Sequence, residues 1–100
     1  MIFIDPEQIT HIEAKDHAVI FYCRDGKYKI WDSLKNVEEK VKDLGFIRVH
    51  RSFLVSLRYI KEIDDGWVVL DDPDGTEVPV GMKYTDAFAE EIKKRKFLFV

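Results

Sequence analysis

The amino-acid sequence predicts a mainly β fold with one or two short helices. The first observation is a succession of short segments rich in β-branched and aromatic residues, separated by polar or turn-forming residues. The second is that only two segments space their apolar residues three and four positions apart, as an amphipathic helix does. The third is that the 100 residues contain neither an internal repeat nor a Gly-, Ser- or Pro-rich linker, which predicts one domain over residues 1–100.

The strands are expected in a regular order along the chain. Polar Lys15-Asp16-His17 and then Asp25-Gly26 supply turns between the first three, and Asp72-Pro73-Asp74-Gly75 supplies a strong turn before the last. The predicted strands cover residues 9–14, 18–24, 27–31, 47–57, 59–63, 66–70 and 76–80.

Two segments interrupt the strand pattern. Residues 34–44 predict a three-turn amphipathic helix, with Asp32 or Ser33 as its cap and Gly45 where it stops. A second helix is expected from Thr85, acting as its cap, with Phe88 and Ile92 on its apolar face. The chain then ends in an apolar segment, residues 97–100.

Composition excludes several classes of protein. No apolar run reaches the roughly 20 residues of a membrane helix, and the N-terminus does not resemble a signal peptide, so a cytoplasmic protein is expected. Cys23 is the single cysteine, so no internal disulfide can form, and one cysteine supplies too few ligands for a structural zinc site. The formal net charge is −3, but residues 64–77 hold six acidic and no basic side chains, whereas residues 45–63 hold four basic and one acidic.

Enzyme motifs are absent from the sequence, so no catalytic residue, metal site or cofactor is predicted. Phosphate-loop, nucleophile-elbow and H-E-x-x-H patterns do not occur. His11-Ile12-Glu13 matches half of a zinc-deaminase motif, but the P-C-x-x-C half is missing, and the two side chains are expected to share a solvated strand face. Asp72–Gly75 lacks the further ligands of a calcium loop and is expected to form only a turn.

Residues 46–60 carry the most informative group of side chains. Strand alternation places Arg48 and His50 on one face, with Arg51 and Ser52 at the following bend. Guanidinium, imidazole and hydroxyl donors in such a group suit phosphate oxygens, and an Arg at a loop tip can reach a guanine edge. The alternative is that Arg48 and Arg51 pair with nearby carboxylates, and the pattern alone does not decide between the two.

The run F-I-R-V-H-R-S-F-L-V-S-L-R-Y-I-K-E-I, residues 46–63, resembles the signature of the LytTR family, the DNA-binding output domain of LytR/AlgR-type bacterial response regulators. The chain also has a family-like Ile12-Glu13-Ala14 strand end, the helix over 34–44, and V-P-V-G-M-K-Y over 78–84. Together the resemblance spans roughly residues 4–92.

This resemblance implies an elongated, antiparallel β-sandwich whose loops enter successive major grooves of double-stranded DNA. By alignment, the base-contacting residues would be His17, Arg51 and Lys83. The residues expected on the DNA backbone are Lys15, Arg48, His50, Ser52 and Tyr84. The family further implies paired direct repeats as targets, dimerisation on DNA and a role in transcription regulation.

The chain departs from the family pattern in ways that keep a second hypothesis open. Val55-Ser56-Leu57 replaces V-N-L, and Gly81-Met82-Lys83 replaces S-R-R or S-R-K, with loss of one positive charge. No receiver segment is recognisable, so the chain is expected to be either a separated output domain or a stand-alone regulator. The alternative function, favoured by Gly81-Met82, the acidic stretch and the apolar tail, is a protein-interaction module with weakened or lost DNA binding.

Overall fold

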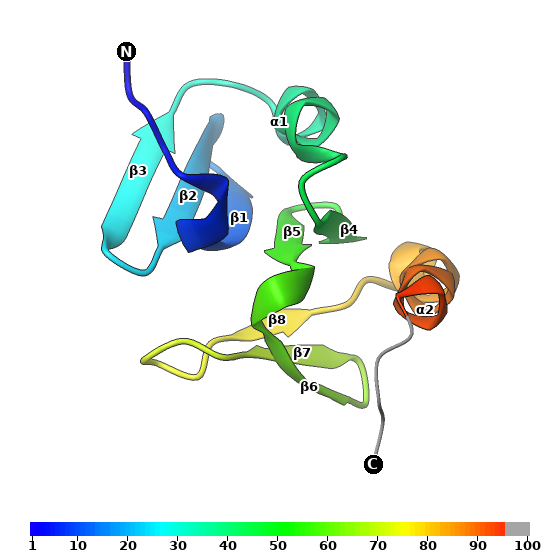
Figure 1. Cartoon of the computed structure of the whole chain (residues 1–100). Helices are drawn as coiled ribbons and strands as arrows, with labels where there is room; N and C mark the ends of the chain where they lie inside the picture. The colour runs from blue at the N-terminus through cyan, green and yellow to red at the C-terminus, as the bar shows by residue number, and fades with distance from the viewer. Residues whose placement is uncertain (96–100) are drawn as a thin grey trace.

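The computed structural model describes residues 1–95 as two antiparallel sheets with two α-helices beside them (Figure 1). The larger sheet has the strand order β3-β2-β1-β5-β4, and the smaller sheet has the order β6-β7-β8. Antiparallel strands make up most of the elements and the principal-axis extents are 41 × 27 × 23 Å, so the prediction of an elongated, mainly β fold is confirmed. The apolar tail, residues 97–100, lies outside the described residues.

The sheets and helices have the following bounds. The larger sheet contains β1 (Ile9–Lys15), β2 (Ala18–Cys23), β3 (Gly26–Ile30), β4 (Phe46–His50) and β5 (Phe53–Ser56). The smaller sheet contains β6 (Ile60–Asp64), β7 (Trp67–Leu70) and β8 (Glu77–Pro79). The helices are α1 (Leu34–Val41) and α2 (Thr85–Lys94), and three short 3-10 turns are η1 (Pro6–Gln8), η2 (Leu57–Tyr59) and η3 (Met82–Tyr84).

Two apolar cores hold these elements together. Leu34, Val37 and Val41 of α1 pack on the larger sheet in the first core. Phe88 and Ile92 of α2 join the smaller sheet and part of β4 and β5 in the second core. Because successive side chains of a strand point to opposite faces, neighbouring residues of β5 serve different cores: Leu54 belongs to the first and Val55 to the second.

Helix α1 is shorter than the apolar spacing predicts. Ser33, one of the two predicted caps, is the N-cap of the helix, because its Oγ accepts a hydrogen bond from the backbone N–H of Asn36 at 3.1 Å. The helix ends at Val41 because the Leu44 N–H donates to the Val41 carbonyl in a turn, and Gly45 follows in a left-handed conformation, φ +84°. Leu44 is therefore half-exposed rather than part of the buried stripe.

Three further sequence predictions are corrected. The predicted strand 47–57 is two strands, β4 and β5, joined by a turn at Arg51-Ser52 where a bend was expected. Tyr59 lies in η2 rather than in a strand, and its buried hydroxyl donates to the Glu7 carbonyl at 2.6 Å. Thr85 does not cap α2; it is the first residue of the helix, and its hydroxyl donates to the Gly81 carbonyl.

The prediction that His11 lies on a solvated face is wrong. A register irregularity in β1 near Ile9 and His11 accompanies burial of the imidazole, which is only 5% exposed and stacks on Tyr22 at a centroid distance of 4.3 Å. The Thr10 hydroxyl forms a hydrogen bond with Nδ1 of His11 at 2.8 Å and also lies 3.2 Å from the Tyr22 carbonyl oxygen. Single-sequence alternation does not detect such an irregularity.

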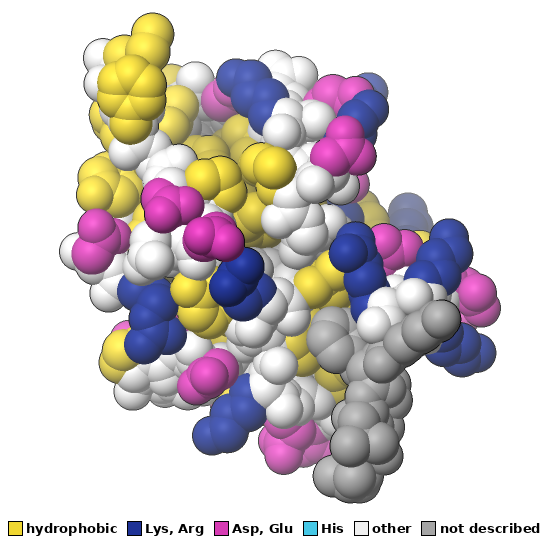
Figure 2. Space-filling model, in the orientation of Figure 1, with side chains coloured by type: hydrophobic (Ala, Val, Ile, Leu, Met, Phe, Trp, Pro, Cys, Tyr) yellow, Lys and Arg dark blue, Asp and Glu magenta, His cyan; other side chains and the backbone are white. Residues whose placement is uncertain are grey.

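The face of the molecule in view in Figure 2 mixes acidic and basic side chains, and apolar side chains gather where the N-terminus lies. Met1 and Phe3 are among the exposed apolar residues of this end. This face therefore presents no continuous basic surface for a nucleic acid. Within residues 1–95, neither helix is long and apolar enough to span a lipid bilayer.

Candidate nucleic-acid interface

Three connections between elements carry the residues that the sequence predicts to read bases. His17 lies in the turn between β1 and β2, Arg51 in the turn between β4 and β5, and Lys83 in η3, and all three side chains are exposed. The N–H of Ala14, near the end of β1, donates to the Ser52 carbonyl of the Arg51 turn at 2.9 Å. The N–H of Gly81, just before η3, donates at 2.7 Å to the carbonyl of Val49 in β4, the strand that leads into the Arg51 turn. The segments beside His17 and Lys83 thus both bond to the β4–β5 hairpin that carries Arg51.

The β1–β2 turn holds His17 in an unusual backbone conformation. Asp16 and His17 both have positive φ, 51° and 63°, although neither is glycine. A two-residue hairpin turn of this kind suits the twist of the flanking strands, but it favours residues without a Cβ, and Asp and His are among the few others that tolerate it. Lys15, the last residue of β1, is exposed beside the turn.

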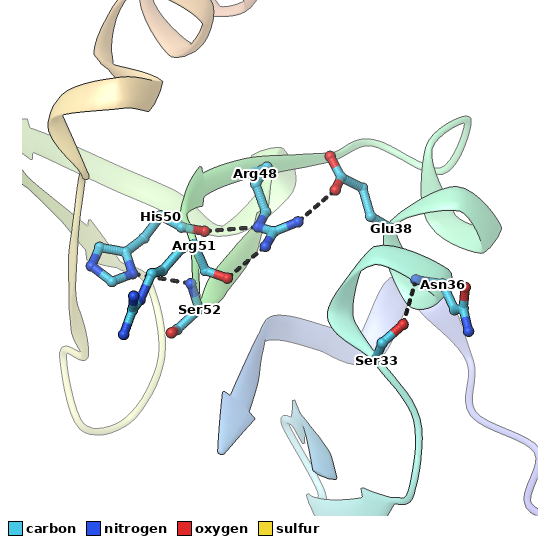
Figure 3. A network of polar contacts seen from close by, with 7 residues as sticks. All are labelled: Ser33, Asn36, Glu38, Arg48, His50, Arg51 and Ser52. Carbon is cyan, nitrogen blue, oxygen red and sulfur yellow. Dashed lines mark hydrogen bonds and ion pairs between the residues drawn. The ribbon is translucent and has the colours of Figure 1, made fainter. Parts of the chain in front are cut away.

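Arg48 lies behind the Arg51 turn, between that turn and helix α1. Its Nη1 donates to Oε1 of Glu38 on α1 at 2.7 Å, its Nε donates to the His50 carbonyl at 2.8 Å, and its Nη2 donates to the Arg51 carbonyl. The side chain is only 18% exposed. Figure 3 shows the guanidinium directed to Glu38, with the His50 and Arg51 side chains on the other side of the turn.

This arrangement corrects the expectation that Arg48 and His50 share one face, because the β4–β5 register shifts between these two residues. The carboxylate-pairing alternative applies to Arg48 but not to Arg51. In the part of the chain that the structure describes, no carboxylate lies within ion-pair distance of the Arg51 guanidinium. Whether Arg48 also contacts a phosphate stays a prediction, although three of its nitrogen atoms already donate within the protein.

His50 and Tyr84 pack around Gly81, where the third connection meets the second. The Ser52 N–H donates to Nδ1 of His50 at 3.0 Å, so Nδ1 is an acceptor and the proton of the neutral ring is left to Nε2. A Cβ added at Gly81 would lie 3.3 Å from Cδ2 of Tyr84 and 3.4 Å from Cδ2 of His50. Glycine in place of the family's serine thus fits a tightly packed contact. The Arg48 guanidinium lies 5.8 Å from the centre of the Tyr84 ring, within the range of a cation–π contact. Arg48 therefore also borders this group of residues.

Glu38 is the residue of this arrangement that the sequence prediction missed. Its position on α1 gives only the pattern of a solvated helix residue, and its contact with Arg48 joins residues ten positions apart on different elements. No local sequence signal reports such a contact. Only the packing of α1 on the larger sheet brings the two side chains together.

A comparison with protein-family models finds that the model described as the LytTr DNA-binding domain matches residues 1–93. The sensory transduction protein LytT of Bacillus subtilis (strain 168) is 36% identical over 97 residues, which cover 94% of this chain and 39% of that protein. The heme-containing CO-sensing transcriptional regulator RcoM 1 of Paraburkholderia xenovorans (strain LB400) is 31% identical over 94 residues, covering 90% of this chain and 35% of that protein. The chain therefore spans less than two fifths of the length of these curated relatives.

A solved structure shares the same arrangement of sheets and helices. A LytTr DNA-binding domain from Bacillus cereus superposes with a TM-score of 0.78 at 28% sequence identity, covering 89% of this chain and 84% of that one. The similarity extends over both sheets of the present chain, so it concerns the whole described fold rather than one motif.

Proposed function

This chain belongs to the LytTR DNA-binding domain family, and we propose that it is a sequence-specific, double-stranded DNA-binding output module of a bacterial transcription regulator. The observation that carries the proposal is the Arg51 turn. The Arg51 side chain is exposed, while Arg48 binds the carbonyls of the turn from behind. A guanidinium on a fixed backbone is suited to bidentate recognition of a guanine edge in the major groove.

The adjoining connections extend this contact along the duplex. His17 and Lys83 would reach bases beside those read by Arg51, which is supported by the backbone hydrogen bonds of Ala14 and Gly81 to the β4–β5 hairpin. The residues proposed to hold phosphates and set the register are Lys15, His50, Ser52 and Tyr84, and a phosphate contact by Arg48 stays a prediction. Two copies on paired direct repeats would add affinity that one copy lacks, and such a regulator would act in the cytoplasm.

The proposal is tested by fluorescence-anisotropy titrations of DNA duplexes at several salt concentrations. The duplexes are promoter-derived, random in sequence, or selected from a random pool for binding to this protein; the last is called the selected duplex. Arg51→Ala is expected to lower the preference for the selected duplex by about 1–3 kcal/mol, since one bidentate base contact is lost. Binding of the unchanged protein should weaken with salt by a log–log slope of about −0.9 per neutralised phosphate.

Arg58→Ala is the matched control, because Arg58 is an exposed arginine of η2 that pairs with Glu7 at 3.0 Å, outside the three connections. It should leave the sequence preference unchanged. If Arg51→Ala and Arg58→Ala have equal effects, the assigned reading face is wrong. If the unchanged protein binds no duplex even at low salt, the protein-interaction module becomes the better hypothesis.

A further inference from the structure

We propose that Glu38 is a positioning residue for DNA reading: through Arg48, it fixes the backbone of the Arg51 turn relative to α1. This inference rests on the proposed function and adds to it a residue that contacts no DNA. It also gives Arg48 a role other than direct phosphate binding.

The first step is that the Arg48 guanidinium connects two elements. On one side it donates to the Glu38 carboxylate at 2.7 Å, and on the other it donates to the carbonyls of His50 and Arg51. Hydrogen bonds between charged groups are stronger than neutral ones, and this pair is partly withdrawn from water, with Arg48 18% and Glu38 41% exposed. The two carbonyls of the turn are therefore tied to the helix.

The second step is that the helix carrying Glu38 is fixed in position. Leu34, Val37 and Val41 of α1 are buried in the first core, and Ser33 caps the helix (Figure 3). Glu38 lies one turn from Leu34 on a helix whose position is set by packing. Sites supported by a rigid element are more precise than sites supported by a loop alone, so the helix is a suitable anchor for the turn.

The third step is that two possible roles of Glu38 make opposite predictions. One role is repulsion of DNA through its charge, and the other is positioning of the Arg51 turn. If the carboxylate acts only through its charge, its removal lowers the repulsion of DNA and tightens binding to every duplex. If it positions the turn, its removal leaves Arg51 less well placed and the sequence preference falls. Glu39 offers a matched control, because it is an exposed carboxylate on the same helix that pairs with Lys42 at 2.6 Å.

The experiment compares Glu38→Ala and Glu39→Ala with the unchanged protein, using the selected and random-sequence duplexes. We expect Glu38→Ala to lower the ratio of the two affinities about 5- to 10-fold, with the salt slope unchanged because no phosphate contact is lost. Glu39→Ala should keep the ratio. An Arg48→Ala, Glu38→Ala double variant should lose little more of the ratio than Arg48→Ala alone, because the two residues act through one contact.

Hydrogen exchange of the free protein tests the same inference without DNA. The Ser52 N–H, which donates to His50 Nδ1, should exchange faster in Glu38→Ala than in Glu39→Ala, while amides of β7 exchange equally in both. Equal exchange of Ser52 in the two variants, or an unchanged affinity ratio, would overturn the positioning role. Failure of the unchanged protein to bind DNA would instead contradict the proposed function, and the exchange result would still decide on the positioning of the turn.

Discussion

Arg48 and Arg51 have the same charged group but different surroundings. Arg48 is mostly covered and donates to three partners within the protein, whereas Arg51 is exposed at the turn that Arg48 supports. The turn at Arg51-Ser52 and the register shift between Arg48 and His50 cause this difference. Burial and backbone direction thus give two residues of the same type different surroundings, and different proposed roles.

His11 gives a prediction about pH. Burial lowers the pKa of His11, and the nearby carboxylates of Asp72 and Glu13 offset this only in part. The unfolded chain therefore binds a proton at a higher pH than the folded protein does, so stability is full above about pH 6.5, the ordinary histidine value, and falls as the pH drops below it.

Urea unfolding between pH 7.5 and 5 measures this effect. Burial would raise the pKa of Asp72, but hydrogen bonds from Thr76 outweigh it and the pKa lies below the ordinary aspartate value, so Asp72 titrates outside this window. Burial, followed by its hydrogen bond to Glu13, raises the pKa of Tyr22 to about 12, also outside the window. His11→Phe should reduce the loss of stability on acidification, and the exposed His17→Gln should not. A pH profile that His11→Phe leaves unchanged would contradict the explanation.

Among the elements, the β1–β2 turn combines a side chain proposed to contact a base with an unfavourable backbone. Asp16 and His17 occupy left-handed conformations that cost a residue with a Cβ roughly 1–2 kcal/mol relative to glycine. Strain of this kind is often kept where a side chain is needed for function. A glycine in the turn would satisfy the backbone but provide no side chain to contact a base.

His17→Gly is therefore expected to raise the free energy of unfolding by about 0.5–1 kcal/mol while lowering the preference for the selected duplex. Asp16→Gly is the control, because it relieves the same kind of strain without removing a predicted base contact. Urea unfolding and the duplex titrations measure the two effects. A loss of sequence preference in Asp16→Gly equal to that in His17→Gly would show that turn geometry, not the imidazole, is responsible.

At the scale of the whole molecule, β5 belongs to both cores. Leu54 and Val55 are almost completely buried on opposite sides of this strand, one in each core. Loss of either core exposes one face of a strand that the other core needs. We therefore expect the two cores to unfold in one cooperative transition, as the predicted single domain over residues 1–100 requires.

Amide NMR peaks of Val19 in β2 and Val68 in β7 report on the two cores during urea unfolding. The two peaks should disappear at the same urea concentration. Leu54→Ala should lower this shared midpoint for both peaks, because it lowers the free energy of unfolding by about 2–5 kcal/mol. The half-exposed Leu44 provides the control, since Leu44→Ala should cost far less. Separate midpoints would show that the cores are independent units.

The strand-rich fold, the turn at Asp72–Gly75, the two helices and the family could all be predicted from the sequence. Asp72 accepts hydrogen bonds from the Thr76 N–H and hydroxyl at 2.8 and 2.6 Å, as expected of a turn that adjacent residues form among themselves. Apolar spacing likewise placed Val37 and Phe88 in cores, because burial of a helix face leaves a regular pattern in the chain.

The burial of His11, the direction of Arg48 toward α1 and its pairing with Glu38 could be seen only in the folded chain. Each depends on a register irregularity or on contacts between elements far apart in sequence, and neither leaves a periodic signal in a single chain. Each residue proposed to touch DNA lies in a short segment that the sequence alone singles out. Glu38, which is proposed to hold the Arg51 turn in place, is not singled out in this way, because a turn is fixed by whatever packs behind it.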